Sequence, residues 1–403
     1  MTTTNRWLIV LGGVLMNLSL GAIYGWSLFV PALRSDLTLT AQQTSLVFAI
    51  AIGVFAVSFL IGGRIQDKKG PYVVSMTGSI LYSLGFLLTS QVSSLQGLYW
   101  AFGLVVGVGA GLGYVTPIAV VSKWFPDRRG LVVGISVGAF GAGSAILGQF
   151  APGWIASAGW QNVMQWLGIG YFVATMIGAQ LLKNPPAGWK PEGWTPAASS
   201  PAKSSGLDFA PSEIIKTPHF WRLWISYALG ASAGLMVISQ LVPYAMSAIP
   251  GTTAAIAGTA VIVGAIGSAL GRILSGWLSD HIGRIKTLSM MIMLSAISLP
   301  LLGRIDTLLM LWPLLFVVYY CYGTLLSVFA STTADFFGSK NVGANYGLVF
   351  LSWGVAGSLG PILAGRLYDQ LGSYTRAFDI LAVLLVVAFI TLVTLKPPQK
   401  ITS

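Results

Sequence analysis

The sequence is poor in the residues that build disulfides, metal sites and soluble surfaces. Its one cysteine, Cys321, cannot form an internal disulfide, and the two histidines, His219 and His281, are too few for a metal cluster. Only 8% of the 403 residues are charged, against roughly 25% in an average soluble domain. These shortages exclude a disulfide scaffold, argue against a soluble protein, and predict that no metal or other cofactor is bound.

Acidic residues are also scarce, and they form no catalytic pattern. All eleven Asp and Glu fall in expected loops or near helix ends, without paired acids or a nucleophile beside a base. The sequence therefore predicts neither an enzyme nor a pump driven by ATP. Several glycines lie in apolar segments with no Walker lysine after them, which favours close helix packing over phosphate binding: Gly107, Gly109, Gly111, Gly113, Gly138, Gly141, Gly143 and Gly148.

Long apolar runs are what the sequence has in abundance. Hydrophobic residues make up 55% of the chain, and the mean hydropathy is +0.78. Apolar stretches of about 20 residues, broken by charged or turn-forming clusters, are typical of membrane-spanning helices. We therefore predict an all-α membrane protein with twelve helices, at approximately 6–33, 42–64, 71–91, 95–123, 129–150, 161–183, 219–247, 253–278, 285–303, 306–334, 342–367 and 374–396. The first run continues through Pro31 without a small-residue cleavage site, so we expect a retained helix.

Lys and Arg are distributed unequally between the loops. With the N-terminus inside, seventeen fall on the cytoplasmic side and four on the other, namely Arg34, Arg304, Arg366 and Arg376. The positive-inside rule then places both termini in the cytoplasm of a multi-pass protein of the inner (plasma) membrane. The net charge of +11 is mostly this topogenic signal, with some loops resting on anionic lipid. Nucleic-acid binding needs a soluble basic face that the chain lacks.

One polar stretch divides the chain. Residues 184–217 contain repeated Pro and Ser that interrupt any periodic pattern, which is typical of a linker. We predict a cytoplasmic linker there, with one six-helix bundle in residues 1–183 and a second in residues 218–403.

The two halves repeat each other. The segment GRIQDKKG at Gly63–Gly70 matches GWLSDHIG at Gly276–Gly283, an offset of 213 residues. The same offset pairs Asp67 with Asp280. Parallel six-helix repeats are typical of transporters whose halves rock about a site at their interface.

This repeated loop resembles the signature of the major facilitator superfamily. The glycines allow two helix ends to approach, and the acid can accept from helix N-terminal amides and pair with a nearby cation. The resemblance implies a latch that holds the cytoplasmic side in one conformation. Its predicted members are Gly63, Asp67, Gly70, Gly276, Asp280, Gly283 and Arg284.

Arg272 is the most unusual residue of the apolar helices. No other ionisable side chain lies in the run from Thr253 to Trp277. A charge at bilayer depth costs at least about 2.5 kcal/mol on insertion scales, so a partner or a function is expected. Arg272 either faces an internal cavity, where an exchangeable anion is its partner, or extends to the lipid headgroups.

Five segments in both halves resemble the oxalate:formate antiporter family, and the chain is also similar to monocarboxylate transporters. KWFPDRRG and the segment that opens with NYG are the most specific. The five are IYGWSLF (Ile23–Phe29), KWFPDRRG (Lys123–Gly130), GRILSGWLSDHIGR (Gly271–Arg284), STTADFFG (Ser331–Gly338) and NYGLVFLSWG (Asn345–Gly354).

That resemblance implies a role for Arg272, and this sequence departs from the family pattern at one position. In the family, oxalate is held between an Arg on the eighth helix, which Arg272 matches, and a Lys on the eleventh, which is Trp353 here. One fixed cation balances one carboxylate, and a second carboxylate against an indole is costly. We therefore predict a monocarboxylate such as lactate, pyruvate or formate, with Trp353 as an apolar wall carrying one N–H donor.

Further aromatic residues stand at family pocket positions. The resemblance places Tyr24 and Tyr114 where the family has pocket tyrosines, Tyr322 where it has a tryptophan, and Phe350 near an aromatic of the eleventh helix. A mostly apolar site with a few convergent donors suits a small ligand. We expect these four residues to bind substrate with Arg272 and Trp353.

The coupling mechanism is left open by the residues. The resemblance to monocarboxylate transporters implies a DxxxR arrangement on the eighth helix, in which the Asp can accept a proton near the Arg. Here Ser268 stands four residues before Arg272 instead. Of the acidic residues, only Asp335 and Asp379 approach membrane depth. Anion exchange and symport of a carboxylate with a proton are both compatible with these residues. We expect the carrier to be a monomer. The alternatives are an oxalate/formate antiporter and an anion sensor of transporter fold without net flux.

Overall fold

The computed structural model describes residues 5–186, 189, 191, 208–338 and 340–398, with residues 67, 129 and 130 described by their backbone only. All regular elements among them are helices: α1 (Arg6–Leu20), η1 (Gly21–Gly25), α2 (Trp26–Asp36), α3 (Ala41–Lys69), α4 (Pro71–Thr89), α5 (Leu95–Leu98), η2 (Tyr99–Val106), α6 (Gly107–Trp124), α7 (Arg129–Ala158), α8 (Trp160–Leu181), α9 (Pro211–Ile214), α10 (Pro218–Ala248), α11 (Ala254–Ile282), α12 (Arg284–Leu302), α13 (Leu308–Phe337), α14 (Val342–Leu371) and α15 (Thr375–Val393).

The predicted all-α membrane protein is confirmed. Eleven helical stretches within the described part are long and apolar enough to cross a membrane, two of them continuous across α1–η1–α2 and α5–η2–α6. The 22-residue helix α8 stands at the position of the remaining predicted span. Two features were not predicted: the first span changes at Gly21–Gly25 to a 3₁₀ helix, which contains Tyr24, and the fourth contains a π-helix at Tyr99–Val106.

The helices repeat at the offset that the loop signature indicated. Helices α3 and α11 each have 29 residues, and both their first and last residues are 213 positions apart. Thr40 and Thr253 cap them in the same way, each side-chain oxygen accepting from the backbone N–H three residues later. Gly70 and Gly283 end them with φ of 83° and 99°, a backbone conformation that side chains with a Cβ rarely adopt.

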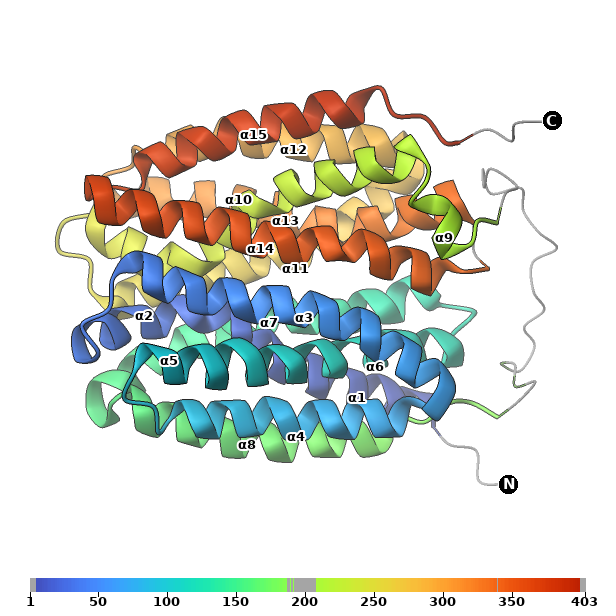
Figure 1. Ribbon diagram of the computed structural model, residues 1–403, viewed down its shortest axis with the longest axis horizontal. Coiled ribbons are helices and arrows are strands. Elements are labelled where there is room, and N and C mark those ends of the chain that lie inside the picture. The colour runs from blue at the N-terminus through green and yellow to red at the C-terminus, as the bar shows by residue number, and fades with distance from the viewer. Residues whose placement is uncertain (1–4, 187–188, 190, 192–207, 339, 399–403) are drawn as a thin grey trace.

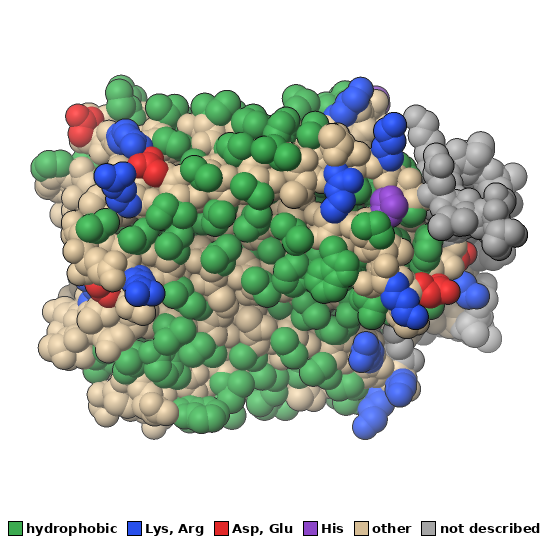
Figure 2. All heavy atoms as spheres, turned by 45° about the horizontal axis from the view of Figure 1, so that its top comes forward, with side chains coloured by type: hydrophobic (Ala, Val, Ile, Leu, Met, Phe, Trp, Pro, Cys, Tyr) green, Lys and Arg blue, Asp and Glu red, His purple; other side chains and the backbone are tan. Residues whose placement is uncertain are grey.

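The helices form two bundles that lie side by side. In Figure 1, α1–α8 form one bundle and α10–α15 the other. The start of α1, the end of α15 and the short helix α9 lie at one end of the long axis, which we call the terminal face, and the opposite end is the distal face. Figure 2 shows hydrophobic side chains along the middle of the visible surface and Lys and Arg gathered towards its two ends. This pattern fits an apolar belt in lipid with charged ends in water.

Two helix pairs form most of the interface between the halves. Helix α3 packs along α14, and α7 packs along α11. A methyl group on Gly148 would lie 2.8 Å from the carbonyl oxygen of Gly258, so α7 and α11 approach closely on the distal side. The packing role predicted for the glycines is confirmed by close approaches at Gly107, Gly109, Gly111, Gly113, Gly143 and Gly148, but not at Gly138, where nothing lies within 4 Å of a Cβ.

Both described ends of the expected linker contact the bundles. Just before its start, the Trp124 indole N–H donates to the Lys183 carbonyl oxygen at 2.6 Å, and Trp189 of the linker packs on Trp124. At its end, the Phe209 carbonyl oxygen accepts from the Asn345 side chain at 3.1 Å. Residues 192–207 lie outside the described residues.

Candidate functional site

Arg272 lies between the two halves and is almost completely buried. Its side chain is 3% exposed, and Nη1 donates to the Val137 carbonyl oxygen of α7 at 2.5 Å. Nε and Nη2 have no hydrogen-bond partner among the residues that the structure describes. No carboxylate among the described residues forms an ion pair with it. The guanidinium thus lies at the interface between the halves, away from the lipid headgroups.

Its two unpartnered donors form one edge of the guanidinium. Nε and Nη2 point in nearly parallel directions from a rigid plane, a geometry that matches the two oxygens of a carboxylate. Because Nη1 is held by Val137, a carboxylate can bind the Nε and Nη2 edge without breaking that contact. The buried donors otherwise represent a considerable cost in free energy.

A chain of hydrogen bonds between aromatic residues crosses the interface beside this arginine. The hydroxyl groups of Tyr24 and Tyr322 are 2.6 Å apart, and the Trp353 indole N–H donates to the Tyr322 oxygen at 2.8 Å. Tyr24 belongs to the first half, whereas Tyr322 on α13 and Trp353 on α14 belong to the second. The N–H that we expected Trp353 to offer to an anion is therefore used by Tyr322 in this structure.

Aromatic rings enclose the rest of the site. Trp353 stacks on Phe350 with ring centroids 4.9 Å apart, and Phe55 of α3 meets Trp353 edge-on at 5.1 Å. Phe140 of α7 lies 4.7 Å from Tyr114. Apolar walls around a few donors are typical of sites for small organic ligands.

The fold brings the six predicted site residues into one connected cluster. Phe140 links the two sides of it, because its ring contacts Tyr24 and Tyr114 and lies 5.9 Å from the Arg272 guanidinium carbon. Val137, Phe140 and Phe55 were missed from the sequence. Val137 contributes only a backbone atom, and the two phenylalanines cannot be distinguished by pattern from other buried rings.

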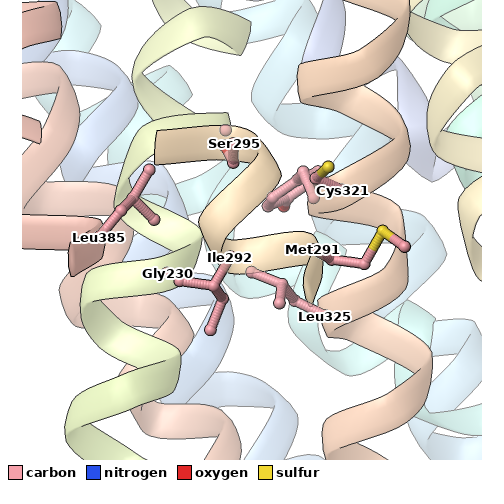
Figure 3. Close-up of a pocket in the computed structure, with 9 residues that line it drawn as sticks. Gly230, Met291, Ile292, Ser295, Cys321, Leu325 and Leu385 are labelled. Carbon is pink, nitrogen blue, oxygen red and sulfur yellow. The ribbon is translucent and has the colours of Figure 1, made fainter. Parts of the chain in front are cut away.

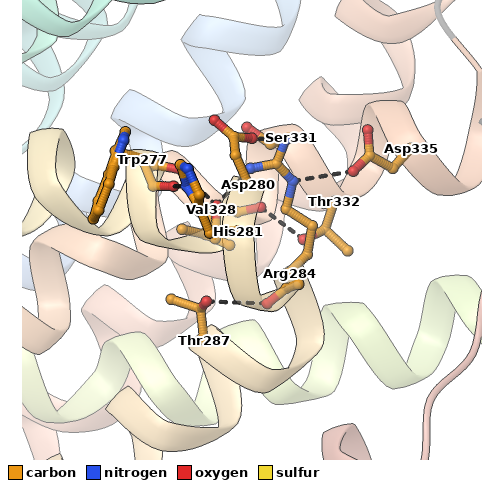
Figure 4. Close-up of polar contacts among 12 residues, drawn as sticks. Trp277, Asp280, His281, Arg284, Thr287, Val328, Ser331, Thr332 and Asp335 are labelled. Atoms are coloured by element: carbon orange, nitrogen blue, oxygen red, sulfur yellow. Dashed lines mark hydrogen bonds and ion pairs between the residues drawn. The ribbon is translucent and has the colours of Figure 1, made fainter. Parts of the chain in front are cut away.

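Figure 4 shows how the repeated loop of the second half is held. Arg284 binds Asp280 at 2.6 Å and Asp335 at 3.0 Å, and thereby joins the end of α11 to the end of α13. All three residues belong to one half, so these ion pairs do not join the halves here. The side chain of Asp67 lies outside the described residues, and the latch role of Gly63, Gly70, Gly276 and Gly283 stays a prediction.

The KWFPDRRG segment fixes the loop that precedes α7. Arg6 at the start of α1 donates to Asp127 at 2.8 Å, and its guanidinium lies 4.4 Å from the Phe125 ring centroid. Partial burial raises the pKa of Asp127, but the hydrogen bonds from Arg6 and from its own backbone, together with the charges of Arg6 and Arg128, outweigh burial and leave that pKa below its ordinary value. The motif therefore has a structural role within the first half.

The acids nearest membrane depth are also engaged. Asp335 binds Arg284, and Asp379 accepts two bonds from Arg304 at 2.7 and 2.9 Å. Ser268, one turn before Arg272, is buried, and no described side chain or backbone group bonds its hydroxyl. The described residues thus place no carboxyl group beside Arg272 to carry a proton.

Two cavities lie beside or away from this cluster, and the first of them borders it at Tyr322. Figure 3 shows a narrow one in the second half, without room for a water molecule, whose wall includes Cys321, Met291 and Leu325. Cys321 is accordingly a packing residue. A larger cavity of about 420 Å³ lies at the distal face between Tyr244, Arg304 and Tyr374. Arg272 lines neither of these two cavities.

Comparison with known proteins agrees with the fold. The family model of the major facilitator superfamily matches residues 11–248 and 229–403. The oxalate:formate antiporter of Oxalobacter formigenes is 26% identical over 96% of this chain and 90% of its own length. Human monocarboxylate transporter 11 is 27% identical over 92% of this chain and 79% of its own length.

Solved structures show the same fold. A bacterial homologue of the human lysosomal transporter Spinster, in an inward-facing and unoccupied conformation, superimposes with a TM-score of 0.72. Its sequence identity is 17%, over 98% of this chain and 97% of that one. Because the family model spans nearly the whole sequence, the chain belongs to the major facilitator superfamily and is a multi-pass membrane transporter related to the oxalate:formate antiporter and the monocarboxylate transporters.

Proposed function

We propose that this protein is a secondary active transporter of small organic anions, and that monocarboxylates such as lactate, pyruvate or formate are its substrates. The observation that carries the proposal is Arg272, a buried cation between the halves with two unpartnered donors on one edge. A carboxylate on that edge satisfies both donors and neutralises the charge. The names of the relatives support the same class of substrate.

The rest of the cluster favours one carboxylate over two. Trp353 stands at the family's lysine position, and its single N–H is bonded to Tyr322. A second carboxylate would lie against aromatic carbon with no cation to balance it, which is unfavourable in a buried site. The rings of Phe350 and Phe55 suit a short carbon tail instead.

Transport proceeds by alternating access, with the site open to one face at a time. The close approach of Gly148 and Gly258 supports a distal face that is closed in this conformation. Charge neutralisation of Arg272 by substrate favours reorientation of the loaded carrier, because an unpaired charge is costly to move through a low-dielectric interior. Anion exchange follows directly from this preference for the loaded carrier. Proton symport requires instead that the carboxylate itself carries the proton.

The protein acts in the inner (plasma) membrane as a monomer, with its terminal face in the cytoplasm. The unequal distribution of Lys and Arg carries this orientation.

Uptake into proteoliposomes tests the proposal. We expect saturable uptake of labelled lactate, pyruvate or formate, accelerated by the same unlabelled anion inside the vesicles, and weak inhibition by oxalate. Strong competition by oxalate would instead support the oxalate/formate antiporter, to which the 26% identity points. Binding without any flux would identify an anion sensor and overturn the transport proposal.

Phe55 should limit the length of the carbon tail. Its ring is 1% exposed and lies opposite Trp353 across the interface. Phe55→Ala removes that wall, so we expect the preference for hexanoate over lactate to rise about tenfold, since one or more methylenes in an apolar pocket change selectivity by that order. Competition against labelled lactate uptake measures it.

Phe86→Ala is the matched control. Phe86 is equally buried in the first half but packs on Tyr82 and Phe102, outside the cluster. An unchanged selectivity in Phe55→Ala, or the same change in Phe86→Ala, would show that Phe55 does not limit the tail.

A further inference from the structure

The first turn of α3 is held by the second half at the distal face. Asp369, near the end of α14, accepts from the backbone N–H groups of Ala41 and Gln42 at 2.9 and 2.8 Å. These are the first two residues of α3, whose amides have no carbonyl partner within the helix. The carboxylate thus acts as a helix cap supplied by the opposite half, in addition to the cap from Thr40.

A second contact reaches the same turn from α10. The buried side chain of Gln240 donates to the Ser45 hydroxyl oxygen at 2.9 Å. Gln240 is held in turn by Tyr374, whose hydroxyl donates to its Oε1 at 3.1 Å. Ser45 donates to the Ala41 carbonyl oxygen at 2.7 Å. Two separate elements of the second half therefore converge on one turn of the first.

The fit between α3 and α14 depends on a close approach at Gly365. A methyl group at this position would lie 2.3 Å from the Ser45 hydroxyl oxygen and 2.7 Å from the Ala41 carbonyl oxygen, too near for either. Arg34 of α2 adds a contact across the interface, with its guanidinium 5.3 Å from the Tyr368 ring centroid. Together these contacts close the distal end of the α3 and α14 pair.

We propose that Asp369 and Gln240 form the catch of the distal gate, which holds the N-terminus of α3 while the distal face is closed and releases it when that face opens. The ion pairs described at the terminal face do not join the halves. Each of them links two residues of the same half, as in Arg6 with Asp127 and Arg284 with Asp335. Opening the distal face must break the bonds to Ala41, Gln42 and Ser45, because the two partners move apart. The catch thus sets how often the empty protein opens distally.

Spin-label distances test this catch without substrate and independently of the proposed function. Labels at Ser93→Cys and Thr307→Cys occupy exposed distal loops of the two halves, away from the catch, and Cys321 is buried. We expect Asp369→Ala to raise the ratio of distally open to closed molecules about fivefold, the typical effect of one lost helix cap. Gln240→Ala should shift the distances in the same direction.

Asp36→Asn is the control for loss of charge. Asp36 also lies at the distal face, but its carboxylate accepts from the Trp160 indole within the first half at 2.8 Å, so the wild-type distances are expected. If the alanine variant does not fold, Asp369→Asn keeps the side-chain size and removes the charge. Wild-type distances in the Asp369 variant, or an equal shift in Asp36→Asn, would overturn the proposal.

Discussion

Arg272→Gln should reduce carboxylate uptake by about 100-fold or more. Loss of a hydrogen-bonded partner of a buried charge costs about 2 to 5 kcal/mol, and each 1.4 kcal/mol is a factor of about ten in affinity. Glutamine keeps one donor group but has no charge. Initial rates of labelled lactate and pyruvate uptake into proteoliposomes, at equal amounts of inserted protein, measure the effect.

Arg272→Lys should recover only part of this activity. Lysine restores the charge but not the planar edge formed by Nε and Nη2, so we expect a loss of about tenfold or more. Arg366→Gln is the control, because Arg366 is exposed on α14. Uptake within a few-fold of wild type in Arg272→Gln would contradict the anchoring role.

Trp353→Lys should shift the preference from lactate to oxalate by at least about tenfold. The substitution places a second cation in the cluster, and two cations balance a dianion that one cannot. It also removes the indole that stacks on Phe350 and the N–H bound to Tyr322. Inhibition of labelled lactate uptake by oxalate, and direct oxalate uptake, measure the shift.

Trp353→Phe separates charge from shape in the same experiment. Phenylalanine keeps an apolar ring against Phe350 but introduces no cation, so the monocarboxylate preference should persist. Oxalate selectivity that is unchanged in Trp353→Lys would mean that this position does not determine how many carboxylates are bound.

Most of the fold follows from the pattern of apolar runs. In a membrane, each span must satisfy its own backbone hydrogen bonds, so length and hydropathy alone determine where helices form. The span predicted at 253–278 is the helix Ala254–Ile282 in the structure. The predicted offset of 213 residues relates both the first and the last residues of α3 and α11. The 3₁₀ helix at Gly21–Gly25 could not be predicted, because it depends on how the first span packs in the bundle.

The site could be predicted only where chemistry is unusual for a membrane helix. The lone arginine of an apolar run could be predicted as a site residue from its charge. The tyrosines were predicted from the resemblance to a family. Phe140 and Phe55 are two of 19 phenylalanines, so only their neighbours identify them. The contact between Asp369 and α3 joins residues 328 and 327 positions apart through backbone amides, which leave no trace in the sequence.

Calorimetric titration of the purified protein tests most directly whether Arg272 binds a single carboxylate. Lactate and its uncharged analogue lactamide have nearly the same shape, so the difference between them reports the charge. We predict that the wild type binds lactate and not lactamide, and that Arg272→Gln binds neither. Equal binding of lactate and lactamide to the wild type, or undiminished binding of lactate to Arg272→Gln, would contradict the claim that Arg272 binds the carboxylate.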